Sequence, residues 1–206
     1  MIITSIELSK SKPVMSKVYI DEELSFCLPQ KRVSVLDLYE GKTISPETLE
    51  YILNYEVYDA AKSTAVNFMA LKLRTSYEIN EKLMELGYEE DIVIRVIENL
   101  TEIDYLNDYQ YAEKYISEKS KLHPKSSKML FMELKNKGIS DEIISSALKE
   151  IELNDENVAF ELLKKRFSKY TSFDEKLIQK MRTFLLGRGF NFSQISKAIS
   201  KFLPIE

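Results

Sequence analysis

The sequence is poor in the residues that build disulfide frameworks, phosphate-binding loops and catalytic pairs. Its 206 residues include one cysteine, one histidine, five glycines and no tryptophan. The single Cys27 excludes an internal disulfide framework, and its only possible imidazole partner is His123. The glycines form no phosphate-binding loop of a recognised spacing. We therefore expect a protein that is not an enzyme, with no catalytic residues, no cofactor and no metal ion.

Long apolar runs are also missing. No stretch approaches the roughly 20 residues that a membrane-spanning helix needs, and residues 1–15 lack the basic and then apolar pattern of a signal peptide. The composition, 44% hydrophobic and 30% charged residues, is that of a folded globular protein. We expect a cytoplasmic protein with no membrane partner.

Three of the five glycines recur at one interval. Gly87, Gly138 and Gly189 are spaced 51 residues apart. Each glycine follows one run with helical apolar periodicity and precedes a second, which is where a residue in the left-handed conformation ends a helix at low cost. The spacing therefore predicts a helix, a glycine corner and a second helix, repeated in tandem.

These signals divide the chain into a small β-rich start and a mainly α remainder. Residues 1–44 contain short β-favouring runs that predict a two- or three-stranded antiparallel module, with a turn at residues 21–23. Ser45 before Pro46 predicts the start of a connecting helix over residues 45–56. Three tandem three-helix repeats then follow in an elongated array, at residues 57–108, 109–155 and 156–206.

Two segments have the spacing of a capping box, in which a hydroxyl and an acid satisfy free amides at the start of a helix. Thr75 and Glu78 stand three residues apart in the first repeat, and Ser172 and Glu175 do so in the third. Both pairs predict the start of the middle helix of their repeat. The acidic residues Glu89 to Asp91 have two explanations, a site for a hard metal ion or a helix start stabilised by its dipole, and the second is favoured.

Charge is distributed unevenly along the chain. Lys and Arg minus Asp and Glu gives −3 for residues 1–56, −6 for 57–108, 0 for 109–155 and +5 for 156–206. A run of charge can be a solvated helix face or an electrostatic binding surface. The concentration of positive charge in the third repeat keeps both explanations open there.

The helix, corner and helix arrangement also resembles a helix-turn-helix. The last helices of the first two repeats are too acidic to enter a DNA groove, whereas that of the third carries Lys197 and Lys201. Four tyrosines have two possible roles, stacking on nucleic-acid bases or packing inside the fold, and their helical spacing favours packing. They are Tyr105, Tyr109, Tyr111 and Tyr115.

Four motifs lie in order between residues 57 and 206. They are Arg74-Thr75-Ser76-x-Glu78 with Leu83; Tyr105-Leu106-Asn107-Asp108-x-x-Tyr111-Ala112-x-x-Tyr115-Ile116; Glu133-Leu134-Lys135-Asn136-Lys137-Gly138-Ile139; and Leu185-Leu186-Gly187-Arg188-Gly189-Phe190 with Ile195 and Ile199. In this order the motifs resemble the RecX family of bacterial recombination regulators. One departure is Pro124-Lys125-Ser126, where many relatives have Lys-Gly-Pro.

The resemblance implies tandem three-helix repeats that bind the RecA filament on single-stranded DNA and restrain its ATP hydrolysis, strand exchange and coprotease activity. It carries no catalytic signature. We expect a monomer with, at most, weak direct DNA contact. Two alternatives stay open: a DNA-binding protein that uses the basic third repeat, and a helical scaffold for another protein.

The charge gradient indicates which residues meet the partner. We predict a partner-binding surface that consists of Arg74, Lys164, Lys165, Arg166, Lys169, Lys180, Arg182 and Arg188. For Arg74 the alternative is a structural salt bridge at the start of a helix.

Overall fold

The computed structural model describes residues 1–10 and 14–203, and these form two compact units. The first unit is Met1–Asn107 and the second is Asp108–Glu206. Each unit has its own buried apolar clusters.

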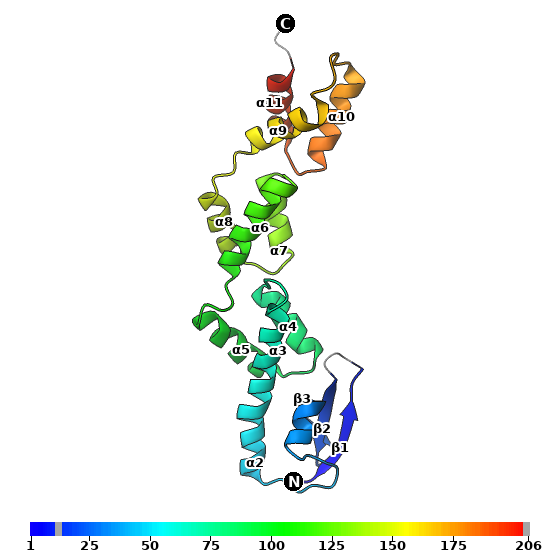
Figure 1. Ribbon diagram of the computed structural model, residues 1–206, viewed down its shortest axis with the longest axis vertical. Coiled ribbons are helices and arrows are strands. Elements are labelled where there is room, and N and C mark those ends of the chain that lie inside the picture. The colour runs from blue at the N-terminus through cyan, green and yellow to red at the C-terminus, as the bar shows by residue number, and fades with distance from the viewer. Residues whose placement is uncertain (11–13, 204–206) are drawn as a thin grey trace. The chain divides into compact units, whose positions relative to one another are not determined.

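The first unit opens with an antiparallel sheet of three strands in the order β1-β2-β3, drawn in blue in Figure 1. The strands are β1 (Ile3–Leu8), β2 (Met15–Ile20) and β3 (Glu23–Pro29). Asp21 and Glu22 connect β2 to β3 with φ values of 49° and 73°. Two successive positive φ angles are typical of the tight turns that match the twist of a hairpin. The predicted β-rich module is therefore confirmed.

The sheet is followed by α1 (Gln30–Val35) and by a helical segment that contains three consecutive elements. These are α2 (Pro46–Tyr51), the π-helix η1 (Ile52–Val57) and α3 (Tyr58–Met69). Ser45 caps the first of them by accepting a hydrogen bond from the backbone N–H of Thr48 at 3.2 Å. The helical backbone has no break at residues 56 and 57, where the connecting helix and the first repeat were predicted to meet.

Within the residues that the structure describes, nine of the helices form the three repeats, with three helices in each. They are α3, α4 (Ser76–Glu85) and α5 (Glu90–Glu102); α6 (Asp108–Leu122), α7 (Ser127–Lys135) and α8 (Asp141–Glu150); and α9 (Asp155–Phe167), α10 (Glu175–Leu186) and α11 (Phe192–Phe202). The predicted fold class, mainly α with three three-helix repeats after a small sheet, is confirmed.

Every middle helix ends at its predicted glycine corner. The φ angles are 86° at Gly87, 78° at Gly138 and 83° at Gly189. At each corner the residue after the glycine donates its N–H to a carbonyl five residues back, as Tyr88 does to Leu83 at 3.3 Å. This is the hydrogen bonding of a helix that ends at a left-handed residue. The three corners thus have one local geometry.

The helix starts agree with the sequence in the first repeat and differ in the third. Thr75 and Glu78 form the predicted capping box of α4. The predicted box at Ser172 and Glu175 is wrong, because α10 begins later and Asp174 is its cap, accepting a hydrogen bond from the N–H of Leu177 at 2.8 Å. A carboxylate one residue before the helix provides a stronger acceptor than the earlier hydroxyl.

Candidate interaction surface

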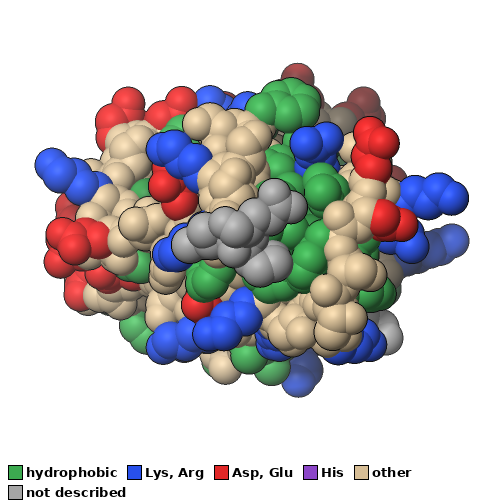
Figure 2. Space-filling model, turned by 90° about the horizontal axis from the view of Figure 1, so that it is seen from above, with side chains coloured by type: hydrophobic (Ala, Val, Ile, Leu, Met, Phe, Trp, Pro, Cys, Tyr) green, Lys and Arg blue, Asp and Glu red, His purple; other side chains and the backbone are tan. Residues whose placement is uncertain are grey.

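The seven cations predicted in the third repeat lie in or next to two helices. They are Lys164, Lys165 and Arg166 in α9, Lys169 after it, Lys180 and Arg182 in α10, and Arg188 after α10. The first three stand in the last turn of α9, where positive side chains interact favourably with the helix dipole. Figure 2 looks onto the end of Figure 1 that carries these helices and shows several Lys and Arg side chains exposed at the surface.

Some of these cations line a hollow between the second and third repeats, which we call the inter-repeat hollow. Its volume is about 720 Å³. Its basic lining comes from both repeats, and consists of Lys119, His123 and Lys125 in the second, and Lys165, Arg166 and Arg188 in the third. No Asp or Glu is among the described residues that line it.

A second hollow, of about 980 Å³, lies along α9 and α10, and we call it the α9–α10 hollow. Its cations are Arg166, Lys169, Lys176 and Lys180, again without an acid among the described lining residues. Arg166 and Phe184 line both hollows. Positive groups therefore border two adjoining depressions, an arrangement that favours a negatively charged partner.

Phe184 holds two of the arginines in place. The guanidinium carbon lies 3.9 Å from the ring centre for Arg188 and 4.6 Å for Arg166. Arg188 also donates a hydrogen bond to the Phe184 carbonyl at 3.2 Å. Burial, and then the charge of Arg166, lowers the pKa of Arg188. Two like charges are thus held close together, a repulsion that a bound anion would relieve.

Polar contacts between the second and third repeats fix the walls of the inter-repeat hollow. Asp155, the first residue of α9, accepts hydrogen bonds from the N–H and the hydroxyl of Ser127 in α7, each at 2.8 Å. Within the third repeat it also accepts a hydrogen bond from the Gln194 side chain at 2.9 Å. The Ser126 N–H donates to the Arg188 carbonyl at 3.0 Å. The cations of the two repeats are therefore positioned by one hydrogen-bonded junction.

Arg74 belongs to the first unit, whereas the other predicted cations belong to the second. Its guanidinium carbon lies 3.6 Å from the centre of the Phe68 ring, and a nitrogen lies 4.0 Å from Glu78. The side chain is only 15% exposed. These contacts are those of a packing residue at the start of α4, in line with the structural alternative for Arg74.

The lysines of α11, the helix that would read a DNA groove, have partners inside the third repeat. Lys197 forms an ion pair with Glu156 at 2.5 Å, and the Lys201 ammonium lies 4.5 Å from the centre of the Phe160 ring. Their charge is partly engaged within the protein, which weakens the helix-turn-helix interpretation.

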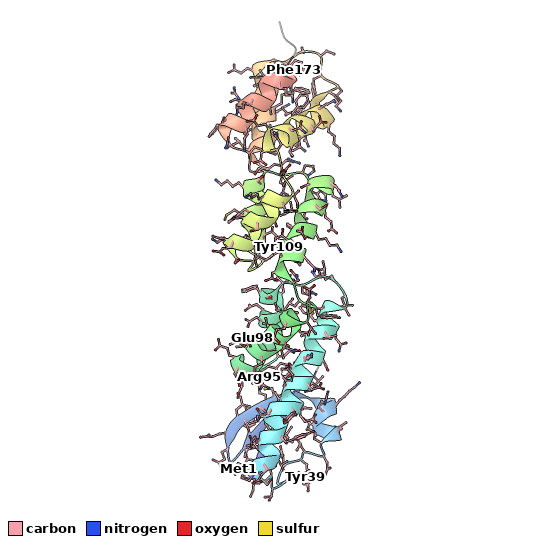
Figure 3. The ribbon with its side chains drawn as sticks, turned by 90° about the vertical axis from the view of Figure 1, so that its left-hand side faces the viewer. Met1, Tyr39, Arg95, Glu98, Tyr109 and Phe173 are labelled. Carbon is pink, nitrogen blue, oxygen red and sulfur yellow. The ribbon has the colours of Figure 1, made fainter. Side chains whose placement is uncertain are left out.

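Three of the four tyrosines pack in the second repeat, as their spacing predicted. Tyr109, Tyr111 and Tyr115 are partly buried against its apolar cluster, while Tyr105 is 49% exposed. Figure 3 labels Tyr109 near the start of α6. Tyr115 also donates to Glu133 at 3.0 Å. These side chains therefore serve the fold of the second repeat and do not form an open stacking platform.

The sequence did not indicate the contribution of the second repeat to the basic surface. Lys119, His123 and Lys125 come from a segment whose repeat has no net charge. They join the site because the last turn of α6 and the loop after it line one hollow with residues of α9 and of the corner after α10. The departure at Pro124-Lys125-Ser126 marked this loop as unusual. Among the residues that the structure describes, no group of three or more His, Cys, Asp or Glu could hold a metal ion.

Comparisons with known proteins agree with the three-repeat architecture. Family models described as the first, second and third three-helix domains of RecX match residues 61–100, 107–148 and 154–199. Regulatory protein RecX of Clostridium acetobutylicum is 32% identical over 205 residues, which cover 97% of this chain and 95% of the relative. That of Clostridium perfringens strain SM101 is 34% identical over 194 residues, 92% of this chain and 91% of the relative.

Two crystal structures show the same fold. A regulatory protein RecX structure covers 97% of this chain and 98% of its own with a TM-score of 0.64 and 22% identity. RecX from Lactobacillus salivarius covers 70% of this chain and 96% of its own with a TM-score of 0.63 and 28% identity.

Fold and surface define a helical-repeat protein with two basic hollows whose described lining contains no Asp or Glu. The sequence matches over nearly the whole chain are more specific. The chain belongs to the RecX family of regulatory proteins. In the part of the chain that the structure describes, no helix is both long enough and apolar enough to span a membrane.

Proposed function

We propose that this protein is a non-catalytic cytoplasmic regulator that binds the RecA nucleoprotein filament and mostly inhibits its ATP hydrolysis, strand exchange and coprotease activities. RecA as the partner follows from the family resemblance. The curated relatives are named regulatory proteins, which supports regulation and not catalysis.

The concentration of cations in the third repeat, several of which border two hollows with no Asp or Glu in their described lining, is the observation that carries the proposed docking site. Its members are Lys164, Lys165, Arg166, Lys169, Lys180, Arg182 and Arg188. A surface with concentrated positive charge accelerates and orients association with an acidic partner. Arg74 is left out of this surface because its guanidinium packs against Phe68.

The DNA-dependent ATP hydrolysis of RecA, titrated with this protein, tests the proposal. We expect hydrolysis to fall as the protein is added. Lys164→Glu, Lys165→Glu and Arg166→Glu together should weaken the inhibition at least tenfold, because repulsion replaces attraction at the docking site. An unchanged inhibition curve would show that this surface does not bind the filament.

A matched control variant makes the same change in net charge at other positions of the protein. Lys121→Glu, Lys128→Glu and Lys149→Glu alter three exposed lysines of the second repeat, outside both hollows. This variant should inhibit nearly as well as the unmodified protein at moderate salt. Equal loss in both variants would indicate a dependence on net charge alone.

Direct binding to DNA is the second candidate function, and the two adjoining basic hollows favour it. It predicts binding to naked single-stranded DNA that weakens steeply with salt and that is as tight without RecA as with it. Weak binding to naked DNA together with tight binding to the RecA filament would favour the regulator instead. Retention on some other protein but not on RecA would favour the helical scaffold.

A further inference from the structure

The inter-repeat hollow adds basic side chains of the second repeat to three that the third repeat contributes to the proposed docking surface. Three of its basic side chains come from the second repeat and three from the third. One of them, Lys125, is neutralised by an ion pair with Glu133. The remaining lysines and arginines converge on one cavity from two domains, which is what binding a compact multivalent anion requires.

The electrostatics of the cavity point the same way. Lys125 and Tyr115 both donate to Glu133; burial alone would raise the pKa of that carboxyl, but these hydrogen bonds, together with the charges of Lys125 and Lys119, outweigh burial and lower it. Glu133 is therefore ionised and occupied by Lys125 on the second-repeat side. On the third-repeat side, Arg166 and Arg188 both lie against the Phe184 ring, and the described cavity lining contains no acidic partner for them.

The rest of the cavity lining is apolar. Leu122, Pro124, Met129 and Leu162 lie on the same cavity as the cations. Leu122 is 70% exposed, a large apolar side chain open to solvent beside a cluster of positive charge. A cavity of a few hundred Å³ that combines apolar side chains with a few convergent charged groups is typical of small-molecule sites. Apolar and cationic groups together suit a ligand with a flat apolar part and a chain of phosphates.

We propose that the inter-repeat hollow binds a nucleoside triphosphate. The phosphates lie among Lys119, Lys165, Arg166 and Arg188, and the base and sugar lie against Leu122 and Met129. The arginine side chains already cover Phe184, so the base does not stack on that ring. The bound phosphates contact both repeats and therefore tie the second repeat to the third.

Titration of the whole protein with magnesium-free ATP, followed by calorimetry and by thermal unfolding at fixed salt, tests the site without RecA. We expect one ATP per chain, a melting temperature that rises with ATP concentration, displacement by inorganic tripolyphosphate, and no binding of adenosine. Binding should weaken with salt because the contacts are ionic. Failure of ATP to bind would overturn the proposal and leave the RecA assay above unaffected.

Matched variants locate the site. Lys119→Gln with Lys165→Gln removes one lysine from each wall and should weaken ATP binding by at least about tenfold, given the usual strength of hydrogen bonds to charged groups. Lys121→Gln with Lys128→Gln makes the same change in net charge at exposed positions outside the cavity and should leave ATP binding within about twofold. Equal weakening by the two variants would show diffuse attraction and no site.

A parallel experiment with an oligonucleotide distinguishes two possible ligands of the cavity, a free nucleotide and the phosphodiester backbone of a nucleic acid, because both carry phosphate groups. We expect ATP to bind with no oligonucleotide present and a short oligothymidylate to compete only weakly. The contrary result has three parts: the oligonucleotide binds, Lys119→Gln with Lys165→Gln weakens oligonucleotide binding, and ATP does not displace the oligonucleotide. In that case the cavity is a nucleic-acid site and the nucleotide proposal is wrong.

Discussion

The first and third repeats end their middle helices at the same glycine corner, but the corners pack against different partners. A Cβ added at Gly87 would lie 2.9 Å from the Cys27 sulfur in β3, so this corner packs against the sheet. A Cβ added at Gly189 would lie 2.6 Å from Ser126 Oγ and 2.8 Å from Met129 Cβ, so that corner packs against the second repeat. The same backbone corner therefore packs against the sheet in the first repeat and against the second repeat in the third.

The two units that contain these corners also differ in net charge. The first unit, residues 1–107, has 11 Lys and Arg against 19 Asp and Glu, whereas residues 108–206 have 18 against 14. Packing on the sheet joins the first corner to an apolar cluster. Packing on the second repeat sets the third corner beside the basic inter-repeat hollow, because Arg188 immediately precedes Gly189. The same corner is therefore structural in one unit and next to the candidate site in the other.

Alanine at the corners should give the largest effects and separate the two contacts. We expect Gly189→Ala to lower the free energy of unfolding by about 3 kcal/mol and Gly87→Ala by about 2 kcal/mol, since positive φ and close packing both oppose a side chain. Met129 Cβ is near the backbone and yields less than the Cys27 sulfur. Denaturant unfolding followed by circular dichroism measures both.

Gly41→Ala is the control for these corners. Gly41 has a φ of 88° but nothing within 4 Å of an added Cβ, so its substitution measures backbone strain alone, about 1 kcal/mol. A Gly87→Ala loss larger than that of Gly189→Ala would contradict the stated order of packing.

Substitutions at Asp155 test the hydrogen-bonded junction between the second and third repeats. Asp155→Ala removes the acceptor for the Ser127 N–H and hydroxyl and for Gln194, and should cost about 2 kcal/mol of unfolding free energy. Asp155→Asn keeps one oxygen acceptor and should cost about half as much. Equal losses in the two variants would show that the charge, and not the hydrogen bonding, supports the junction.

Helix caps give smaller effects and check the corrected start of α10. Asp174→Ala should cost about 1 kcal/mol, as should Thr75→Ala at the capping box of α4. Ser172→Ala should stay within about 0.5 kcal/mol, because this residue does not cap the helix. Thermal unfolding of the three variants measures these differences in unfolding free energy. A larger loss of stability for Ser172→Ala than for Asp174→Ala would show that Ser172 caps the helix, as the sequence predicted.

The smallest effect at neutral pH is expected at Tyr88, the residue after the first corner. Burial raises the pKa of Tyr88 to about 12 from 10.0. The folded state therefore binds more protons than the unfolded state between these values, so the contribution of Tyr88 to stability is complete below pH 10 and is lost as the pH rises towards 12. Tyr88→Phe should flatten this alkaline loss, and Tyr39→Phe, at an exposed position, should not. If stability falls between pH 10 and 12 in the same way in Tyr88→Phe and in the unmodified protein, the alkaline loss does not come from Tyr88.

Much of the fold could be predicted because its signals are local. The glycine interval, the capping box at Thr75 and the β-favouring runs each depend on neighbouring residues, and each appears in the structure where the sequence placed it. The cap of α10 was missed because Ser172 and Asp174 offer competing acceptors two residues apart. Choosing between them depends on where the helix packs, and not on local spacing.

The candidate site was predictable only in part. The excess of positive charge in the third repeat is a property of composition, and it indicated Lys165, Arg166 and Arg188. The basic side chains of the second repeat were not indicated, because their segment has no net charge. Arg74 was predicted to bind the partner because it is a charge just ahead of a helix start; the structure packs it on Phe68, and its role in binding stays a prediction.

The sequence by itself determined the number of repeats, the conformation of their corners and the sign of the charge in each segment, because backbone conformation and composition are set over a few consecutive residues. Only the tertiary structure decided which surfaces those charges share. Lys119 and Arg188 are 69 positions apart along the chain, and they line one cavity because Ser127 and Asp155 join the repeats that carry them.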